Sequence, residues 1–250
     1  MSDFVSIFFH NYYGQHRQWI QFFAERITVP FNLYYNIVEN SIYNMEEDLA
    51  AVCDGKNNFA ANHLQKIVFR HSSNKGKDIG GKLVLMDAFM HLKDESEYLV
   101  FLHDKKSPYK IQSREWQQKL FRIVESAFTE KALTIFKDDP GVGIIAGADS
   151  IYSEYDHTSH SFASNNDGLL HKMRGEYDIR NTDYRFVAGT MFWVRSLPLL
   201  TFFKQNAPLD IRKDLEQGNI MDDTKGTLTH TWERMLSWLV NEQGYKLKGI

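Results

Sequence analysis

Hydrophobic and polar residues follow one another along the chain in blocks whose lengths suit strands and helices in turn. Short apolar runs of strand length occur at residues 4–9, 31–38, 66–70, 98–102, 142–146 and 186–194. Apolar residues recur at helical spacing at residues 15–26, 79–92, 114–136, 197–203 and 228–240. Strands separated by helices predict an α/β fold with a mostly parallel central sheet flanked by helices.

One long segment, residues 149–183, has no such period and is rich in Ser, Asn, Asp, His and Tyr. Loops of this length inside a domain are usually functional or disordered, and we expect a lid over an acceptor cleft here. No repeat or low-complexity linker divides the chain. We therefore expect one domain over residues 1–250.

Composition narrows the class of protein. Hydrophobic residues make up 43% and charged residues 24% of the chain, as in ordinary globular proteins. The formal net charge of -3 argues against nucleic acid as a partner. The single cysteine, Cys53, cannot form an intramolecular disulfide. Because no secretory signal and no membrane-length apolar run is visible, we expect a cytoplasmic protein, which a partner or a lipid-linked acceptor would attach to the inner face of the membrane.

Polar segments directly follow three of the apolar runs, at residues 10–13, 74–78 and 103–107. In an open parallel sheet, ligands bind outside the carboxyl ends of the strands. We therefore expect these segments, beginning with His10, to meet at one binding site.

The segment His103-Asp104-Lys105-Lys106-Ser107 offers groups that suit a diphosphate. The two lysines would neutralise phosphate charge as it builds on a leaving group. Asp104, with His103, would hold a divalent cation such as Mg or Mn on the same oxygens. The alternative interpretation is a solvated charged turn.

A second candidate is the turn that contains Asn74, Gly76, Lys77 and Asp78 at the start of a helix. Backbone N–H groups and the helix N-terminus there would attract phosphate. The spacing matches neither a Walker motif nor a dinucleotide fingerprint. Alternatively, Asp78 is a helix cap and the glycines of this segment allow close packing.

The last predicted helix brings further polar groups, with Thr227 as its expected cap. His230 and Arg234 lie four residues apart, so a polar strip would face the cleft while Leu228, Trp232, Leu236 and Leu239 pack inward. We interpret His230 either as a metal ligand or as a structural histidine.

Three carboxylates precede this helix: Glu216, Asp222 and Asp223. One of them would deprotonate an acceptor hydroxyl, as the base of an inverting transfer does. The alternative is a flexible acidic loop. The chain has no Gly-x-Ser-x-Gly elbow and no His-Glu-x2-His motif, which disfavours hydrolases.

Taken together, five ordered segments resemble the rhamnan synthesis protein F family of bacterial polysaccharide glycosyltransferases. They are His10 with Tyr12-Tyr13, then residues 74–80, 101–107, 186–195 and 226–234. The resemblance implies a GT-A-like, Rossmann-related fold and transfer of a deoxyhexose, typically rhamnose from dTDP-rhamnose, to a growing glycan. It also implies that His10, Gly189 and Arg234 lie at the nucleotide-sugar site.

The chain departs from the family pattern at two places. The family commonly has threonine where this chain has Asp104, so the resemblance implies no metal role for Asp104. The family usually has Asp-Gly-Thr before the last helix, whereas Lys225 precedes Gly226 here. The acidic function then moves to Asp222 or Asp223, or rests with Glu216.

Two other functions compete with glycosyl transfer. A non-catalytic carbohydrate-binding or scaffolding subunit would bind glycans without releasing nucleotide. A phosphoryl-transfer enzyme would use Asp104 and a metal, although the missing Walker pattern disfavours it. Loss of Lys105 and Lys106 would weaken donor binding in a transferase and leave a scaffolding subunit unaffected.

Overall fold

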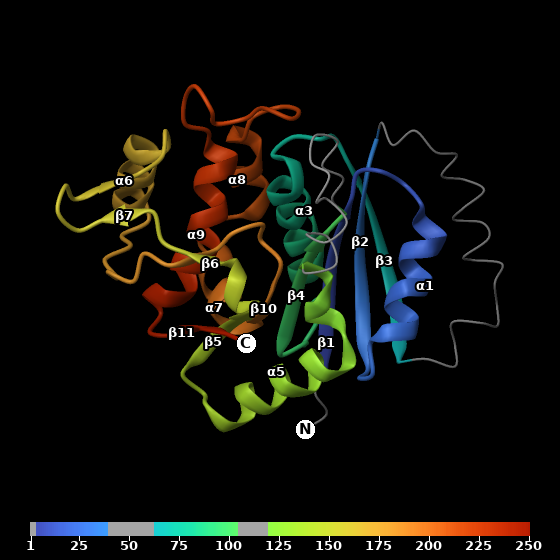
Figure 1. Cartoon of the computed structure of the whole chain (residues 1–250). Coiled ribbons are helices and arrows are strands. Elements are labelled where there is room, and N and C mark those ends of the chain that lie inside the picture. Colours follow the sequence, from blue (N-terminus) through green and yellow to red (C-terminus); the bar gives the residue numbers. More distant parts are fainter. Residues whose placement is uncertain (1–3, 40–62, 105–119) are drawn as a thin grey trace.

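The computed structural model describes residues 4–39, 63–104 and 120–250 of the chain. Its centre is a seven-stranded sheet with the order β11-β5-β10-β4-β1-β2-β3 (Figure 1). The strands are β1 (Val5–Asn11), β2 (Phe31–Val38), β3 (Leu64–Ser72), β4 (Tyr98–His103), β5 (Val142–Ala146), β10 (Phe192–Arg195) and β11 (Lys246–Gly249). Strand β10 is antiparallel to β4 and β5, and the other neighbours in this sheet pair in parallel. The predicted mostly parallel sheet is confirmed.

The central strands are apolar along most of their length, and all residues of β1, β2 and β4 are buried. Such strands need cover on both faces of the sheet. Successive side chains point to opposite faces. In β1, Val5, Ile7 and Phe9 belong to one hydrophobic cluster, whereas Phe8 belongs to the other. The sheet therefore lies between two helical layers.

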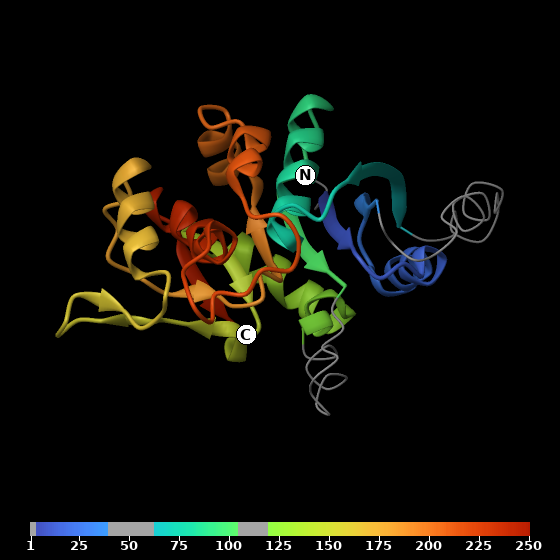
Figure 2. The same cartoon turned by 90° about the horizontal axis from the view of Figure 1, so that it is seen from above.

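One layer contains α1 (His16–Arg26) and α5 (Ser126–Asp138), which pack on the cluster around Phe9. The other layer packs on the cluster around Phe8. It contains α3 (Lys77–His91), α6 (Asp167–Glu176), α7 (Ser196–Phe203), α8 (Pro208–Asp214) and α9 (Leu228–Glu242). Figure 2 shows the two layers from above. This arrangement confirms the predicted α/β class, a GT-A-like fold.

The strand predicted for residues 186–194 is interrupted, which corrects that prediction. Gly189 (φ 79°) and Thr190 (φ 48°) adopt left-handed backbone conformations that end one strand and start a turn. The result is β9 (Phe186–Val187), which pairs with β6 (Ile151–Tyr152), and the separate strand β10.

Residues 149–183 are not an irregular loop. They contain β6, β7 (Tyr155–Asp156), β8 (Ser161–Phe162) and α6. Phe162 anchors them by packing on Trp238 of α9 at a ring-centroid distance of 5.4 Å. The helix predicted for residues 114–136 appears as η1 (Arg122–Val124) and α5, and residues 114–119 lie outside the described ranges. No helix in the described ranges has the length and apolar character needed to cross a membrane.

Candidate functional site

A hollow of about 90 Å³ lies at the carboxyl ends of β1 and β4, beside the N-terminus of α3. It is lined by His10, Tyr12, Tyr13, Asn74, Lys77, Asp78, His103, Asp104 and Asn219. The loop between α8 and α9 closes one side, since Gly76 N donates to Glu216 O at 2.7 Å and Gly218 N donates to Asn74 O at 3.2 Å. The described residues of the three predicted strand-end segments therefore meet here, together with this loop.

Asp104 shapes the loop that follows β1. Its carboxylate oxygens accept hydrogen bonds from Tyr12 N at 2.8 Å and Tyr13 N at 2.6 Å. Its own N–H donates to His10 O at 3.0 Å. Backbone amides thus engage both carboxylate oxygens, as in other charge-assisted hydrogen bonds. Metal binding by Asp104 stays a prediction.

His10 lies buried under the hollow. The side-chain amide of Asn36 donates to His10 Nδ1 at 3.0 Å. Burial lowers the pKa of His10 to about 4, so the ring is neutral at pH 7. Gly81 of α3 makes room for this ring, because a Cβ at that position would lie 1.9 Å from Nδ1. A glycine of α3 is therefore required for the position of His10.

The turn into α3 passes through two left-handed residues, Gly76 (φ 73°) and Lys77 (φ 50°). Gly76, rather than Asp78, is the N-cap of α3, so the alternative interpretation of Asp78 as the cap is wrong. A Cβ on Gly80 would lie 1.8 Å from Lys75 O. The predicted close packing of glycines in this segment is confirmed.

Asp78 forms a buried network with Lys82, His103 and Thr190. Lys82 Nζ lies 2.7 Å from Asp78 Oδ2 and 3.3 Å from His103 Nδ1. Thr190 Oγ1 donates to Asp78 Oδ2 at 2.6 Å. Burial alone would raise the pKa of Asp78, but Lys82, His103 and the two hydrogen bonds outweigh it and hold this pKa well below its usual value. The network joins α3, β4 and the turn before β10.

That turn is also attached to α9. Gly189 N donates to Glu233 Oε1 at 2.6 Å, and Arg234 Nη1 donates to Glu233 Oε2 at 2.8 Å. Arg234 also pairs with Glu154, and its guanidinium lies 4.6 Å from the centroid of the Phe186 ring. The described partners of Arg234 hold α9 against β9. Donor binding by Gly189 and Arg234 stays a prediction.

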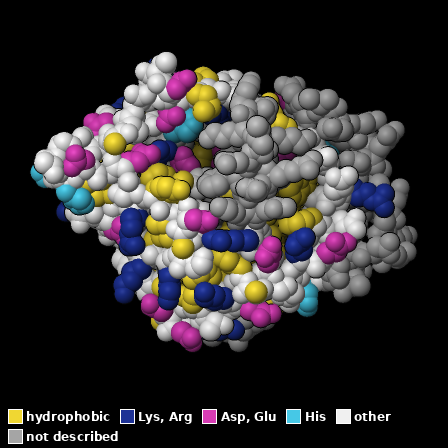
Figure 3. All heavy atoms as spheres, in the orientation of Figure 1, with side chains coloured by type: hydrophobic (Ala, Val, Ile, Leu, Met, Phe, Trp, Pro, Cys, Tyr) yellow, Lys and Arg dark blue, Asp and Glu magenta, His cyan; other side chains and the backbone are white. Residues whose placement is uncertain are grey.

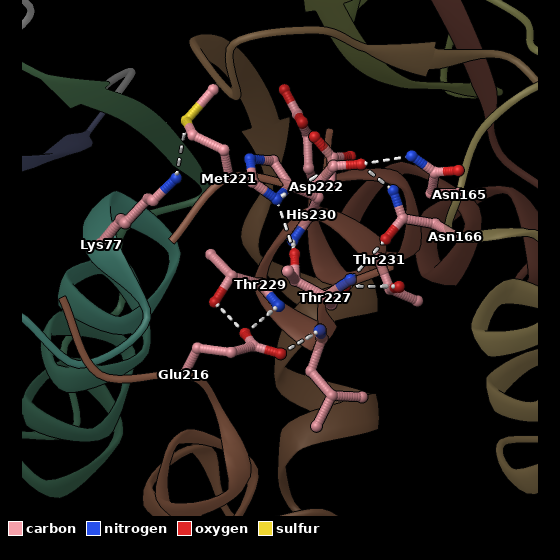
Figure 4. Close-up of polar contacts among 12 residues, drawn as sticks. Lys77, Asn165, Asn166, Glu216, Met221, Asp222, Thr227, Thr229, His230 and Thr231 are labelled. Atoms are coloured by element: carbon pink, nitrogen blue, oxygen red, sulfur yellow. Dashed lines mark hydrogen bonds and ion pairs between the residues drawn. The ribbon is translucent and has the colours of Figure 1, made fainter. Parts of the chain in front are cut away.

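Glu216 occupies the N-terminus of α9 (Figure 4). Its Oε1 accepts from Leu228 N at 2.6 Å, and its Oε2 accepts from Thr229 N at 2.9 Å and Thr229 Oγ1 at 2.7 Å. Thr227 is the N-cap, as predicted. Burial raises the pKa of Glu216, but these hydrogen bonds lower the pKa by more than burial raises it, so the net shift is downward. A carboxylate held this way is a weak base for an acceptor hydroxyl.

Asp222 and His230 lie together above that helix end (Figure 4). Asp222 Oδ2 accepts from Asn166 Nδ2 at 2.6 Å and lies 3.9 Å from His230 Nδ1. His230 Nδ1 also contacts Thr227 Oγ1 at 2.6 Å. Burial, followed by the charge of Lys77, lowers the pKa of His230. Asp223, next in the chain, is exposed.

Among the described residues, Lys77 is the lysine that lines the hollow. Its Nζ points toward the loop between α8 and α9 and contacts Met221 Sδ at 3.7 Å (Figure 4). It makes no ion pair with any described residue. Burial lowers the pKa of Lys77, although Asp78 and Asp222 oppose this shift. In Figure 3, lysine and arginine side chains lie mostly on the lower half of the face, whereas acidic side chains and histidine dominate near the start of α9.

Residues 2–245 match the family described as rhamnan synthesis protein F. The chain belongs to this family. No curated protein sequence matches it. Membership of the rhamnan synthesis protein F family suggests a glycosyltransferase role related to rhamnan synthesis, in agreement with the resemblance found in the sequence.

Three predicted site residues of this family member fall in a range that the structure does not describe. Lys105, Lys106 and Ser107 lie outside the described residues. Among the residues that are described, no three His, Cys, Asp or Glu side chains gather into a set that would hold a metal ion. The predicted metal ligands Asp104 and His230 have separate sets of protein partners.

The sequence analysis did not select Lys82 or Asn219. Lys82 is 2% exposed in an otherwise apolar helix segment, four residues after Asp78. A lysine on an apolar helix face with an acidic residue one turn earlier is a signal that would have found it. Asn219 Nδ2, which contacts Tyr12 Oη at 3.4 Å, joins the hollow only through the tertiary fold.

Proposed function

We propose that this chain transfers a deoxyhexose, rhamnose from dTDP-rhamnose, to a growing cell-surface polysaccharide or lipid-linked glycan. The observation that carries the proposal is the meeting of three strand-end segments around one hollow, beside a half-buried lysine without a described ion-pair partner. Family membership supports the same activity. Such a desolvated cation in a hollow is typical of functional sites.

The donor diphosphate would bind to Lys77 and to the N-terminus of α3. The carboxylates around the hollow already have partners: Asp78 pairs with Lys82, Asp104 accepts backbone amides, and Glu216 caps α9. Lys77 therefore has charge to offer a phosphate, and the helix N-terminus adds partial positive charge. Lys105 and Lys106 would add further positive charge for the diphosphate.

Of the three candidate bases, Asp222 is best supported. Glu216 is held by hydrogen bonds from Leu228 and Thr229, whereas the carboxylate of Asp222 accepts from Asn166 and its side chain is 26% exposed beside His230. Burial raises the pKa of Asp222, but the hydrogen bond from Asn166 and the charge of His230 outweigh it, so this pKa is lowered too, and the exposure of Asp222 is what favours it. In the proposed step, the acceptor hydroxyl oxygen attacks the anomeric carbon and Asp222 takes its proton. The bond from the anomeric carbon to the diphosphate oxygen breaks, and dTDP leaves with the electron pair.

A lipid-linked acceptor would bring the protein to a membrane face. The loop that carries Asn219 also exposes two apolar side chains, Ile220 (41% exposed) and Met221 (59% exposed). Apolar side chains at the edge of the hollow would contact the lipid portion of such an acceptor.

A ligand panel tests the donor. The thermal midpoint would be measured with dTDP-rhamnose, UDP-sugars and GDP-sugars, each with and without manganese. At a ligand concentration of about 100 times Kd, stabilisation of about 2.7 kcal/mol, or roughly 5–10 °C, is expected for the true donor. No shift with any nucleotide sugar would contradict the proposal. Glycan binding without nucleotide release would instead identify a scaffolding subunit.

Turnover of two variants tests the base. Asp222→Asn keeps a side chain of the same size beside Asn166 and should lower kcat by at least about a hundredfold, because general base catalysis contributes about 10²–10⁴. Asp223→Asn, on an exposed neighbour, would be measured in parallel. Loss of turnover in Asp223→Asn alone would assign the base to Asp223.

A further inference from the structure

A second pocket of about 230 Å³ lies between α6, α8 and the start of α9. Figures 1 and 2 show α6 and α8 beside α9 at this end of the molecule. The pocket is lined by Lys172, Met173, Glu176, Tyr177, Ile211, Asp214, Leu228 and Trp232. None of these residues lines the hollow at the carboxyl ends of β1 and β4. Its volume, below the roughly 300–1,000 Å³ of drug-sized sites, suits a single ring.

The floor of this second pocket is aromatic. The ring of Tyr177 lies 5.4 Å from that of Trp232 and 5.3 Å from that of Phe202, both at steep angles. Trp232 is buried, whereas Tyr177 is only partly buried, and both residues line the pocket. An aromatic surface of this kind accepts the C–H face of a sugar ring and presents a polar edge beside it.

Charged side chains surround that floor. Lys172 and Glu176 come from α6, and Asp214 ends α8; all three are exposed. Burial, then the charges of Glu176 and Asp214, raises the pKa of Tyr177, so its hydroxyl keeps its proton and can donate. The pocket therefore offers two carboxylate acceptors, an ammonium donor and a phenol around an apolar surface.

This chemistry selects among ligands. Two carboxylates and one ammonium group repel an anion such as a phosphate. A hydrocarbon chain would desolvate the carboxylates without giving them hydrogen bonds, which is costly. A neutral ring with many hydroxyl groups avoids both the charge repulsion and the loss of hydrogen bonds. Its hydroxyls donate to Glu176 and Asp214 while its C–H face covers Tyr177.

The position of the pocket links it to the proposed transfer. Leu228 lines the pocket, and its N–H is held by Glu216, whose carbonyl oxygen accepts from Gly76 at the first hollow. One short stretch of chain thus separates the two sites.

We propose that the pocket between α6, α8 and α9 binds a neutral pyranose unit of the glycan acceptor, with Tyr177 as its platform and Glu176 and Asp214 as hydroxyl acceptors. Its assignment to the acceptor rests on the proposed function. The binding of a saccharide in the pocket does not depend on the proposed function.

Saccharide binding would be measured by calorimetry and by saturation-transfer NMR with rhamnose di- and trisaccharides, on the full chain. The test variant is Glu176→Gln/Asp214→Asn. Asp210→Asn is the control on α8, because Asp210 is exposed and does not line the pocket. Loss of both charged acceptors should weaken binding by at least about tenfold, with the control unchanged. Circular dichroism would verify that each variant is folded.

A second variant, Tyr177→Leu, removes the platform while keeping an apolar side chain, and it should abolish the NMR transfer signal from the sugar C–H protons. dTDP-rhamnose binding, measured on the same samples, should not change. Saccharide binding of equal strength in the wild type and the double variant overturns the pocket assignment, as does a wild type that binds donor but no saccharide. Saccharide binding that depends on these residues, in a chain that binds no nucleotide sugar, would keep the pocket and refute the proposed transfer.

Discussion

The ion pair between Asp78 and Lys82 permits a quantitative prediction. Lys82 is 2% exposed, and its ammonium lies 2.7 Å from the Asp78 carboxylate. Asp78→Asn removes the charge and leaves the ammonium buried. Removing one partner of a buried pair costs about 3–5 kcal/mol. Because the Asp78 side chain keeps 23% exposure, we expect the lower end, about 3 kcal/mol, or a loss of roughly 6–12 °C in Tm.

The assay is urea unfolding followed by circular dichroism, on Asp78→Asn, Lys82→Met and the double variant. Lys82→Met removes the buried ammonium, so the double variant should be more stable than the sum of the two single losses predicts, by at least about 1 kcal/mol. Asp87→Asn is the control on the same helix. Its pair with His91, which is 75% exposed, should contribute less than about 1 kcal/mol.

Two results would refute this reasoning. One is a loss of stability in Asp78→Asn no larger than in Asp87→Asn. The other is strict additivity of the two single losses in the double variant. Either would mean that solvent or other groups neutralise Lys82 without Asp78.

Three further predictions concern the walls of the hollow. His10 has a pKa of about 4 when folded and 6.5 when unfolded, so its stabilisation is present above pH 6.5 and is lost as the pH falls towards 4. Between pH 7.5 and 5 the wild type should lose about 2 kcal/mol more than His10→Gln, and parallel pH curves would argue against this. Gly81→Ala, whose Cβ would meet His10, should cost at least about 1–3 kcal/mol, whereas Gly175→Ala, with open space around it, should stabilise by about 0.5–1 kcal/mol; thermal melts of equal midpoint would show that the ring simply moves aside. Glu216→Gln should cost about 1 kcal/mol by weakening the start of α9, and an unchanged urea midpoint would deny Glu216 that role.

Much of the sheet could be predicted because buried parallel strands have a simple signature. The apolar runs that became β1, β4 and β5 show it clearly, and each is fully buried. The same signature led to the wrong prediction of one continuous strand before and through β10, because residues 186–194 are also mostly apolar. Two left-handed residues, Gly189 and Thr190, create a turn inside that run, and hydrophobic pattern carries no information on the sign of φ.

The site could be predicted as a meeting of strand ends but not in its internal contacts. The segments at His10, Asn74 and His103 converge because parallel strands place their carboxyl ends at one edge. Thr190 reaches Asp78 across 112 residues of chain, and Glu216 reaches Thr229 from a separate loop. Such contacts depend on tertiary packing, which local periodicity does not encode.

The central claim, that the hollow at the ends of β1 and β4 binds the donor diphosphate, is tested most directly by calorimetric titration of dTDP-rhamnose into three proteins: the wild type, Lys77→Met and Lys131→Met. Lys131 is an exposed lysine of α5, in the helical layer on the other face of the sheet. The account predicts binding that Lys77→Met weakens by at least about tenfold and Lys131→Met leaves unchanged. A wild type that binds no nucleotide sugar, or a Lys77→Met variant that binds it as tightly as the wild type, would contradict the account.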